Sequence, residues 1–136
     1  MRSTTTLAMT LAFMASSRLA TAQEVIHLPS GDTVAILAVT QIRAPNRPPG
    51  LLIRFYPYTS LADTIHLRKL ALSLRQTLRP KIEATGVPWL VLQATDQTPG
   101  PHLGIIRGEN YGFVLEKRSN GKWYFLDGSE PIDDAH

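Results

Sequence analysis

The sequence predicts an α+β domain, in which a curved, mostly antiparallel sheet of about five strands (order ββαβ(β)ββ) packs on one long, proline-kinked helix. Only one long segment has apolar residues at helical spacing, whereas several short runs are rich in β-branched and aromatic residues. The 136-residue chain shows no repeat or long internal linker, so we expect one domain. We expect three parts along the chain: a signal peptide (1–22), the globular domain (23–127) and a polar, frayed C-terminal tail (128–136).

The first 22 residues have the features of a secretory signal peptide. Arg2 supplies a positive charge, residues 7–15 form an apolar run, and Ala20-Thr21-Ala22 is a small-x-small cleavage site. The apolar run is shorter than the roughly 20 residues that span a bilayer. We therefore expect cleavage after Ala22 and a periplasmic or secreted protein that does not span the membrane.

The chain contains no cysteine. This excludes disulfide bonds, thiolate metal sites and a cysteine nucleophile. A secreted domain of this size without disulfides has to be held together by its hydrophobic core alone, which favours the bacterial periplasm or cell exterior over a eukaryotic secretory product.

Charge is unevenly distributed, although the net charge is only +3. Residues 43–81 carry eight basic residues and one acid, whereas residues 82–136 carry eight acids and four basic residues. Either the basic region binds an anionic partner, such as a glycan or a lipid headgroup, or the two halves pack together and their charges complement one another. The second interpretation is favoured. The export signal and the small net charge argue against nucleic acid as a partner.

Two strands are predicted in the first half of the chain. Residues 34–43 and 51–58 are apolar, β-rich runs, and the second ends near Pro57. The intervening segment 44–50 contains three prolines, which cannot donate ladder hydrogen bonds. We expect these strands to form a hairpin over the proline loop.

The long helix follows these strands. We expect Ser60 to be its N-cap, with Asp63 completing a capping box, and Gly86 to close it in a left-handed conformation. Pro80 interrupts the pattern and predicts a bend, because proline lacks the N–H of a helical hydrogen bond. One apolar stripe is predicted to face the sheet: Leu67, Leu70, Ala71, Leu74, Leu78 and Ile82.

The second half of the chain predicts three more strands and one optional strand. Residues 87–94 form an apolar central strand, residues 95–110 form a loop that contains an optional strand at 103–107, and the last two strands form a hairpin. Asn120-Gly121 is a preferred two-residue type I′ turn. The resulting register pairs Arg118 with Trp123, Glu116 with Phe125, and Leu115 with Leu126. With Leu115 and Leu126 in the core, the rings of Trp123 and Phe125 would lie exposed on the other face.

The motifs of common enzyme classes are absent from the sequence. It contains no HExxH, GxSxG, P-loop, GxGxxG or EF-hand pattern, and its four histidines are scattered. We therefore expect no catalytic residue, no metal and no cofactor. Two alternatives remain: a small envelope hydrolase with a dispersed site near His102, or a small-ligand carrier whose cavity between helix and sheet is lined by Trp89, Phe55 and Tyr111.

Three surfaces are candidates for binding. Strand alternation places Arg54, Tyr56 and Tyr58 on one face of the sheet, where rings beside a guanidinium suit a sugar or a peptide. The predicted hairpin places Arg118, Trp123 and Phe125 together on an exposed face. The helix also carries apolar residues opposite its main stripe: Leu61, Ile65 and Leu72. The sequence thus predicts an exported, non-catalytic binding domain that contacts a protein partner, or a second copy of itself, through a sheet face or edge.

Overall fold

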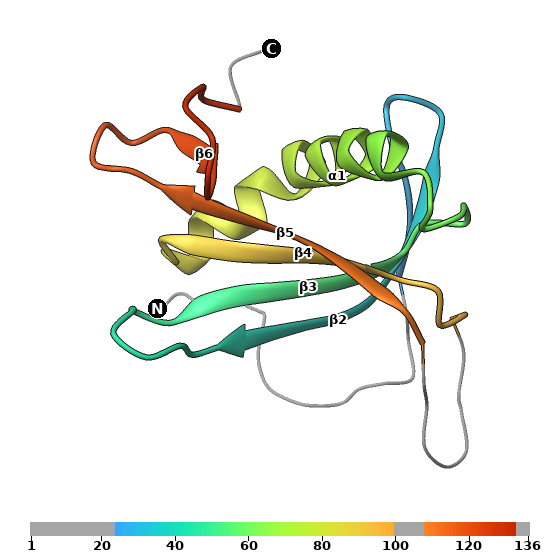
Figure 1. The fold of residues 1–136 in the computed structure, drawn as a ribbon, viewed down its shortest axis with the longest axis horizontal. Helices are drawn as coiled ribbons and strands as arrows, with labels where there is room; N and C mark the ends of the chain where they lie inside the picture. The colour runs from blue at the N-terminus through green and yellow to red at the C-terminus, as the bar shows by residue number, and fades with distance from the viewer. Residues whose placement is uncertain (1–23, 100–107, 133–136) are drawn as a thin grey trace.

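The structure, a computed structural model that describes residues 24–99 and 108–132, has one helix packed against one face of a six-stranded sheet (Figure 1). The strands follow one another across the sheet in chain order. The elements are β1 (Glu24–His27), β2 (Thr33–Ile42), β3 (Gly50–Tyr56), α1 (Thr64–Thr85), β4 (Trp89–Thr95), β5 (Asn110–Lys117) and β6 (Trp123–Phe125). This confirms the α+β prediction. The optional strand at 103–107 lies outside the described residues.

The sheet is antiparallel at every strand pair except β3 and β4. These two strands are parallel because α1 lies between them in the chain. The helix brings the chain back to the end of the sheet at which β3 begins, as in any β-α-β crossover. The predicted hairpin over the proline loop is confirmed by the antiparallel pairing of β2 with β3, although a bulge between Ile36 and Ala38 interrupts its register.

Strand β1 was not predicted from the sequence. It pairs with the start of β2 through a tight turn, in which Leu28 donates its N–H to the Asp32 carbonyl at 2.8 Å. Gly31 makes this turn possible with a φ of 94°, a value that favours glycine. With only four residues, β1 is too short to give a clear alternating pattern.

The N-cap of helix α1 is Asp63 rather than Ser60. The Asp63 carboxylate accepts the N–H of His66 at 3.1 Å, whereas the hydroxyl of Ser60 accepts the N–H of Ala62 in a preceding turn. The predicted capping box is therefore wrong: the acid itself fills the capping position. Gly86 ends the helix at φ 73°, and Pro80 lies inside it on the exposed side, both as predicted.

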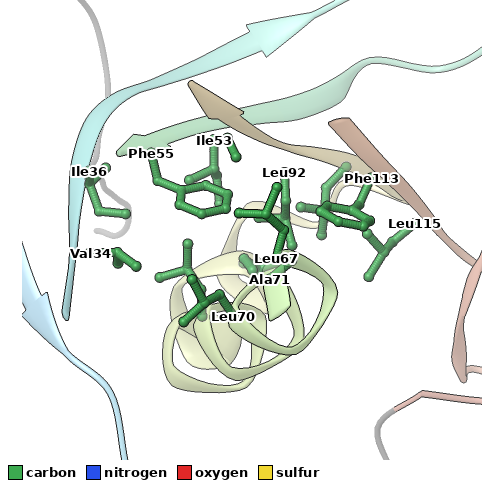
Figure 2. Close-up of a cluster of buried hydrophobic side chains, with 14 of the residues drawn as sticks. Val34, Ile36, Ile53, Phe55, Leu67, Leu70, Ala71, Leu92, Phe113 and Leu115 are labelled. Carbon is green, nitrogen blue, oxygen red and sulfur yellow. The ribbon is translucent and has the colours of Figure 1, made fainter. Parts of the chain in front are cut away.

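The core lies between α1 and the sheet (Figure 2). Strand residues such as Ile53, Phe55 and Leu92 point toward Leu67 and Ala71 of the helix. The predicted helix stripe is buried, apart from Leu78, which is partly buried. Alternate strand residues therefore define a helix-covered face and, on the opposite side of the sheet, a face over which the described residues place no helix.

The register of the last hairpin differs from the prediction by one residue. Leu115 pairs with Phe125, and Lys117 with Trp123, because the loop has three residues rather than two. Gly121, at φ 83°, donates its N–H to the Arg118 carbonyl, and Arg118 donates to the Lys122 carbonyl. A one-residue shift exchanges the faces of a strand. It places Trp123 and Phe125 in the core, while Leu126 is 46% exposed.

The segment after β6 folds back onto the sheet as far as the structure describes it. Ile132 donates its N–H to the Trp123 carbonyl at 2.9 Å, and its side chain packs against the core. Gly128 accepts a hydrogen bond from the Arg118 guanidinium at 2.9 Å. Gly128 and Ile132 of the predicted tail therefore contact the domain.

Candidate binding surface

The sheet face opposite α1, here called the uncovered face, carries the most accessible group of predicted site residues. On β3, Ile53 and Phe55 are buried against the helix, whereas Arg54 and Tyr56 lie partly exposed on the opposite side. This confirms the predicted alternation of the strand. The uncovered face continues across β4 and β5 through Val91, Gln93, Gly112 and Val114.

Arg54 lies in a row that runs across three strands. It is opposite Gln93 of β4, which is opposite Gly112 of β5. The Nε of Arg54 donates a hydrogen bond to the Gln93 side-chain oxygen at 3.0 Å. Within the described residues, no hydrogen bond or ion pair involves the two terminal nitrogens of Arg54. The guanidinium is thus oriented by one bond and keeps a pair of donors for a ligand.

The rings of Tyr56 and Tyr58 adjoin this row. Their centroids are 4.7 Å apart in an edge-to-face arrangement, and Tyr58 is 53% exposed. Tyr58 has a φ of 56°, which is uncommon for a residue other than glycine. The structure therefore brings together the predicted site residues Arg54, Tyr56 and Tyr58, and adds Gln93 and Gly112 to them.

A second group on the uncovered face lies at the other end of the strands. Trp89, Glu116 and Tyr124 occupy one cross-strand row. The guanidinium of Arg47 lies over the Trp89 ring at 4.6 Å, and that of Arg118 lies over the Tyr124 ring at 4.0 Å. The Glu116 carboxylate forms ion pairs with both arginines, at 3.8 Å from Arg47 Nη2 and 3.0 Å from Arg118 Nε. Both rings are buried beneath this layer, so these arginines cover the aromatic surface.

Gly50 explains how the Trp89 ring lies flat on the sheet. A Cβ at this position would come within 2.4 Å of the indole. The Trp89 Nε1 donates to the Pro48 carbonyl at 2.7 Å, so the ring is also tied to the proline loop. This group is accordingly a packed structural unit.

The predicted exposed group of Arg118, Trp123 and Phe125 does not form. Trp123 and Phe125 are buried on the helix-covered face, and Arg118 stacks on Tyr124 of the opposite face. Different arginines contact the two buried rings: Arg75 lies 5.3 Å from the Trp123 ring, and Arg68 lies 3.8 Å from that of Phe125. The one-residue register shift is the cause of this exchange.

Glu83 connects the end of α1 to the last hairpin. Its carboxylate accepts hydrogen bonds from Trp123 Nε1 at 3.1 Å and from Lys117 Nζ at 3.2 Å. Burial alone raises the pKa of Glu83, but these two hydrogen bonds and the charges of Lys117 and Arg75 outweigh it. The pKa of Glu83 is therefore lowered below the usual glutamate value.

The second apolar side of the helix is covered only in part. Leu61 and Leu72 pack against the core as partly buried residues, whereas Ile65 is 73% exposed. A single exposed isoleucine is ordinary for a protein surface. This side of the helix therefore offers no extended apolar patch.

The three residues proposed to line a ligand cavity lie on two faces of the sheet. Phe55 is fully buried on the helix-covered face, Trp89 lies on the uncovered face, and Tyr111 is 40% exposed beside Phe113. His102, around which a dispersed catalytic site was considered, lies outside the described residues. Among residues 24–99 and 108–132, no group of histidines and acids could hold a metal ion. In that same part of the chain no helix is long and apolar enough to cross a membrane.

Electrostatic contacts join the two halves of the chain across the sheet and along α1. Arg47 of the basic half approaches Glu116 of the acidic half, and the charge of Arg75 acts on Glu83. These contacts support charge complementarity between the halves. Arg54 stands apart, since its guanidinium donates a hydrogen bond to the neutral side chain of Gln93.

Sequence analysis missed Gln93, Gly112 and the Arg47–Trp89 contact. A glycine in the middle of a strand marks a place where another chain or a ligand can approach closely, and Gly112 gave that signal. Gln93 could be paired with Arg54 only once the parallel register of β3 and β4 was known. Comparisons with protein-family models, curated proteins and solved structures gave no match to this chain.

Proposed function

We propose that this protein is an exported, non-catalytic interaction domain that acts in the bacterial periplasm or cell exterior and binds a protein partner through the uncovered face. The export signal supports the location. The observation that carries the binding role is the Arg54–Gln93 hydrogen bond beside Gly112. This bond orients the guanidinium next to an exposed strand position that has no side chain.

The composition of the surrounding surface supports a protein as the ligand. Leu52, Val91 and Val114 form a partly exposed apolar row next to the Arg54 row, and Tyr58 adds an accessible ring. Arginine and tyrosine beside apolar side chains are enriched at the centres of protein interfaces. An acidic or carbonyl-rich segment of the partner would accept the terminal N–H groups of Arg54.

Site-specific photo-crosslinking in the producing cells tests this proposal. We would replace Tyr58 by a photoreactive phenylalanine, and Ile65 on the helix as a matched exposed control. We expect one adduct of defined mass with another protein at position 58 and none at position 65. No adduct at either position, or the same adducts at both, would contradict the proposal.

A variant of Arg54 shows whether the guanidinium is required. Arg54→Ala should reduce the adduct yield at position 58 at least about tenfold, because the charged hydrogen bonds to the partner are lost. Lys69→Ala, on the exposed side of α1, is the matched charge control and should leave the yield unchanged. Equal yields for both variants would exclude Arg54 from the interface.

A further inference from the structure

Among the described residues, the outer part of β2 forms an edge of the sheet. Strand β2 is ten residues long, but β1 pairs only with Thr33–Ile36. Beyond the bulge at Leu37, Ala38–Ile42 pair with β3 on one side, and no strand of the described residues lies on the other. Figure 1 shows β2 at the margin of the sheet over this length.

This edge lacks the features that usually prevent association. Exposed edge strands in monomeric proteins carry charged residues or proline, because their free N–H and C=O groups otherwise pair with another chain. Strand β2 contains neither a charged residue nor a proline. Val39 is 54% exposed, and Thr40 and Gln41 are also exposed.

We propose that two copies of the chain associate through this edge, antiparallel and centred on Thr40, so that their sheets become one continuous sheet. In a continuous sheet, two residues that pair across the interface point to the same face. A two-fold axis perpendicular to the sheet satisfies this condition only when it passes through a residue that pairs with its own copy. If the axis passed through Val39, Ile42 of one copy would lie opposite Ile36 of the other. That position is already taken by Glu24 of β1. Centred on Thr40, the pairs run from Ala38 to Ile42 and end before β1.

Charge complementarity identifies a second copy as the occupant. In this register Arg43 follows Ile42 past the last pair and comes next to the end of β1, where Glu24 pairs with Ile36. Both side chains are exposed, and neither forms an ion pair within the described residues. The two-fold axis creates this contact twice, and it places no like charges together.

The dimer would present two binding surfaces in one direction. Because the axis is perpendicular to the sheet, both helices lie on one side and both uncovered faces on the other. A partner with two matching segments would gain from their proximity. The dimer inference rests on β2 and β1 alone and does not depend on the proposed partner.

Disulfide trapping tests the register directly. The chain has no cysteine, so Thr40→Cys introduces the single thiol of each copy. Directly opposed residues of antiparallel strands have Cα atoms about 4.5–5.5 Å apart, within the range that a disulfide spans. We expect mild oxidation to give a covalent dimer for Thr40→Cys and none for Gln76→Cys on the exposed side of α1. Equal trapping of the two variants would overturn the proposal.

Sedimentation of the exported protein tests the association itself. Five residue pairs make a small interface, so we expect a dimer with a dissociation constant of about 1–100 μM. Glu24→Arg and Arg43→Glu should each weaken it about tenfold or more, and the double variant should restore it. A monomer at every concentration up to about 0.5 mM would overturn the dimer. A dimer that neither charge reversal weakens would overturn the Thr40-centred register.

Discussion

The two faces of the sheet are built from the same strands, yet they differ in how their side chains are covered. On the helix-covered face, Phe55, Leu92 and Leu115 are fully excluded from solvent. Their neighbours on the uncovered face, Arg54 and Gln93 among them, are partly exposed. Burial on one side supplies the stability of the fold, so the residues on the other side are less constrained by folding and are available for binding.

The uncovered face is itself divided into two ends. At one end, the guanidiniums of Arg47 and Arg118 lie over Trp89 and Tyr124 and cover their rings, as a helix would. At the other end, Tyr58 is more than half exposed beside Arg54, and no arginine is stacked on its ring within the described residues. An arginine beside an aromatic ring therefore favours a binding site only where, as at Tyr58, the ring remains exposed to solvent.

Truncating adjacent residues of β3 gives the largest expected contrast between the faces. Phe55→Ala should lower the free energy of unfolding by about 3–5 kcal/mol, because it leaves a cavity in a core that cannot fully collapse. Tyr56→Ala, one residue later on the uncovered face, should cost about 1 kcal/mol or less. Urea unfolding followed by circular dichroism measures both values. Similar losses for the two variants would remove the distinction between the faces.

Gly50→Ala tests whether the covered end of the uncovered face is a packed unit. The new Cβ would overlap the Trp89 indole and displace it from the sheet, at a cost of about 1–3 kcal/mol. Loss of the hydrogen bond to the Pro48 carbonyl should also change the tryptophan fluorescence. The buried Trp123 contributes equally to both proteins and serves as the internal reference. An unchanged spectrum and stability would show that the ring is loosely held.

Gly112→Ala should have a smaller effect of the opposite sign. A Cβ here meets only Val91 at 3.7 Å, an ordinary contact, so alanine should stabilise the strand by about 0.5–1 kcal/mol. If the partner approaches the sheet closely at this point, the same change lowers the crosslinking yield at Tyr58. A variant that is both more stable and fully active in crosslinking would place the interface elsewhere on the uncovered face.

Regular patterns in the sequence predicted the described elements other than β1, but not the register of the last hairpin. The helix stripe and the alternation of β3 depend on periodicity, which a single chain reveals. The register of the last hairpin depends on whether its loop has two or three residues. The burial of the Trp123 and Phe125 rings outweighs the preference of Asn120-Gly121 for a two-residue type I′ turn. Asn120 stabilises the longer loop, since its side chain bonds the Lys122 N–H and the Tyr124 hydroxyl.

The candidate site was predictable only where it lay on one strand. Arg54, Tyr56 and Tyr58 are close in sequence, so alternation was enough to group them. Gln93 and Gly112 join them through pairing across β4 and β5, which local patterns do not specify. Asp63 and Ser60 illustrate the same limit at the helix start, because either residue type can cap a helix and the turn between them decides which one does.

The smallest expected effect is a pH dependence at Glu83, which fastens the helix-covered face to the last hairpin. Because its folded pKa lies below the unfolded value, the ionised carboxylate stabilises the fold above the usual glutamate pKa. That contribution declines as the pH falls below about 4.5 and is lost once the pH passes through the folded pKa. Glu83→Gln keeps a hydrogen-bond acceptor for Trp123 but carries no charge. Its stability relative to the unmodified protein should therefore be lower at neutral pH, and the difference should shrink in acid. A difference that is constant from neutral pH down to about pH 3 would show that the charge of Glu83 does not hold α1 to the hairpin.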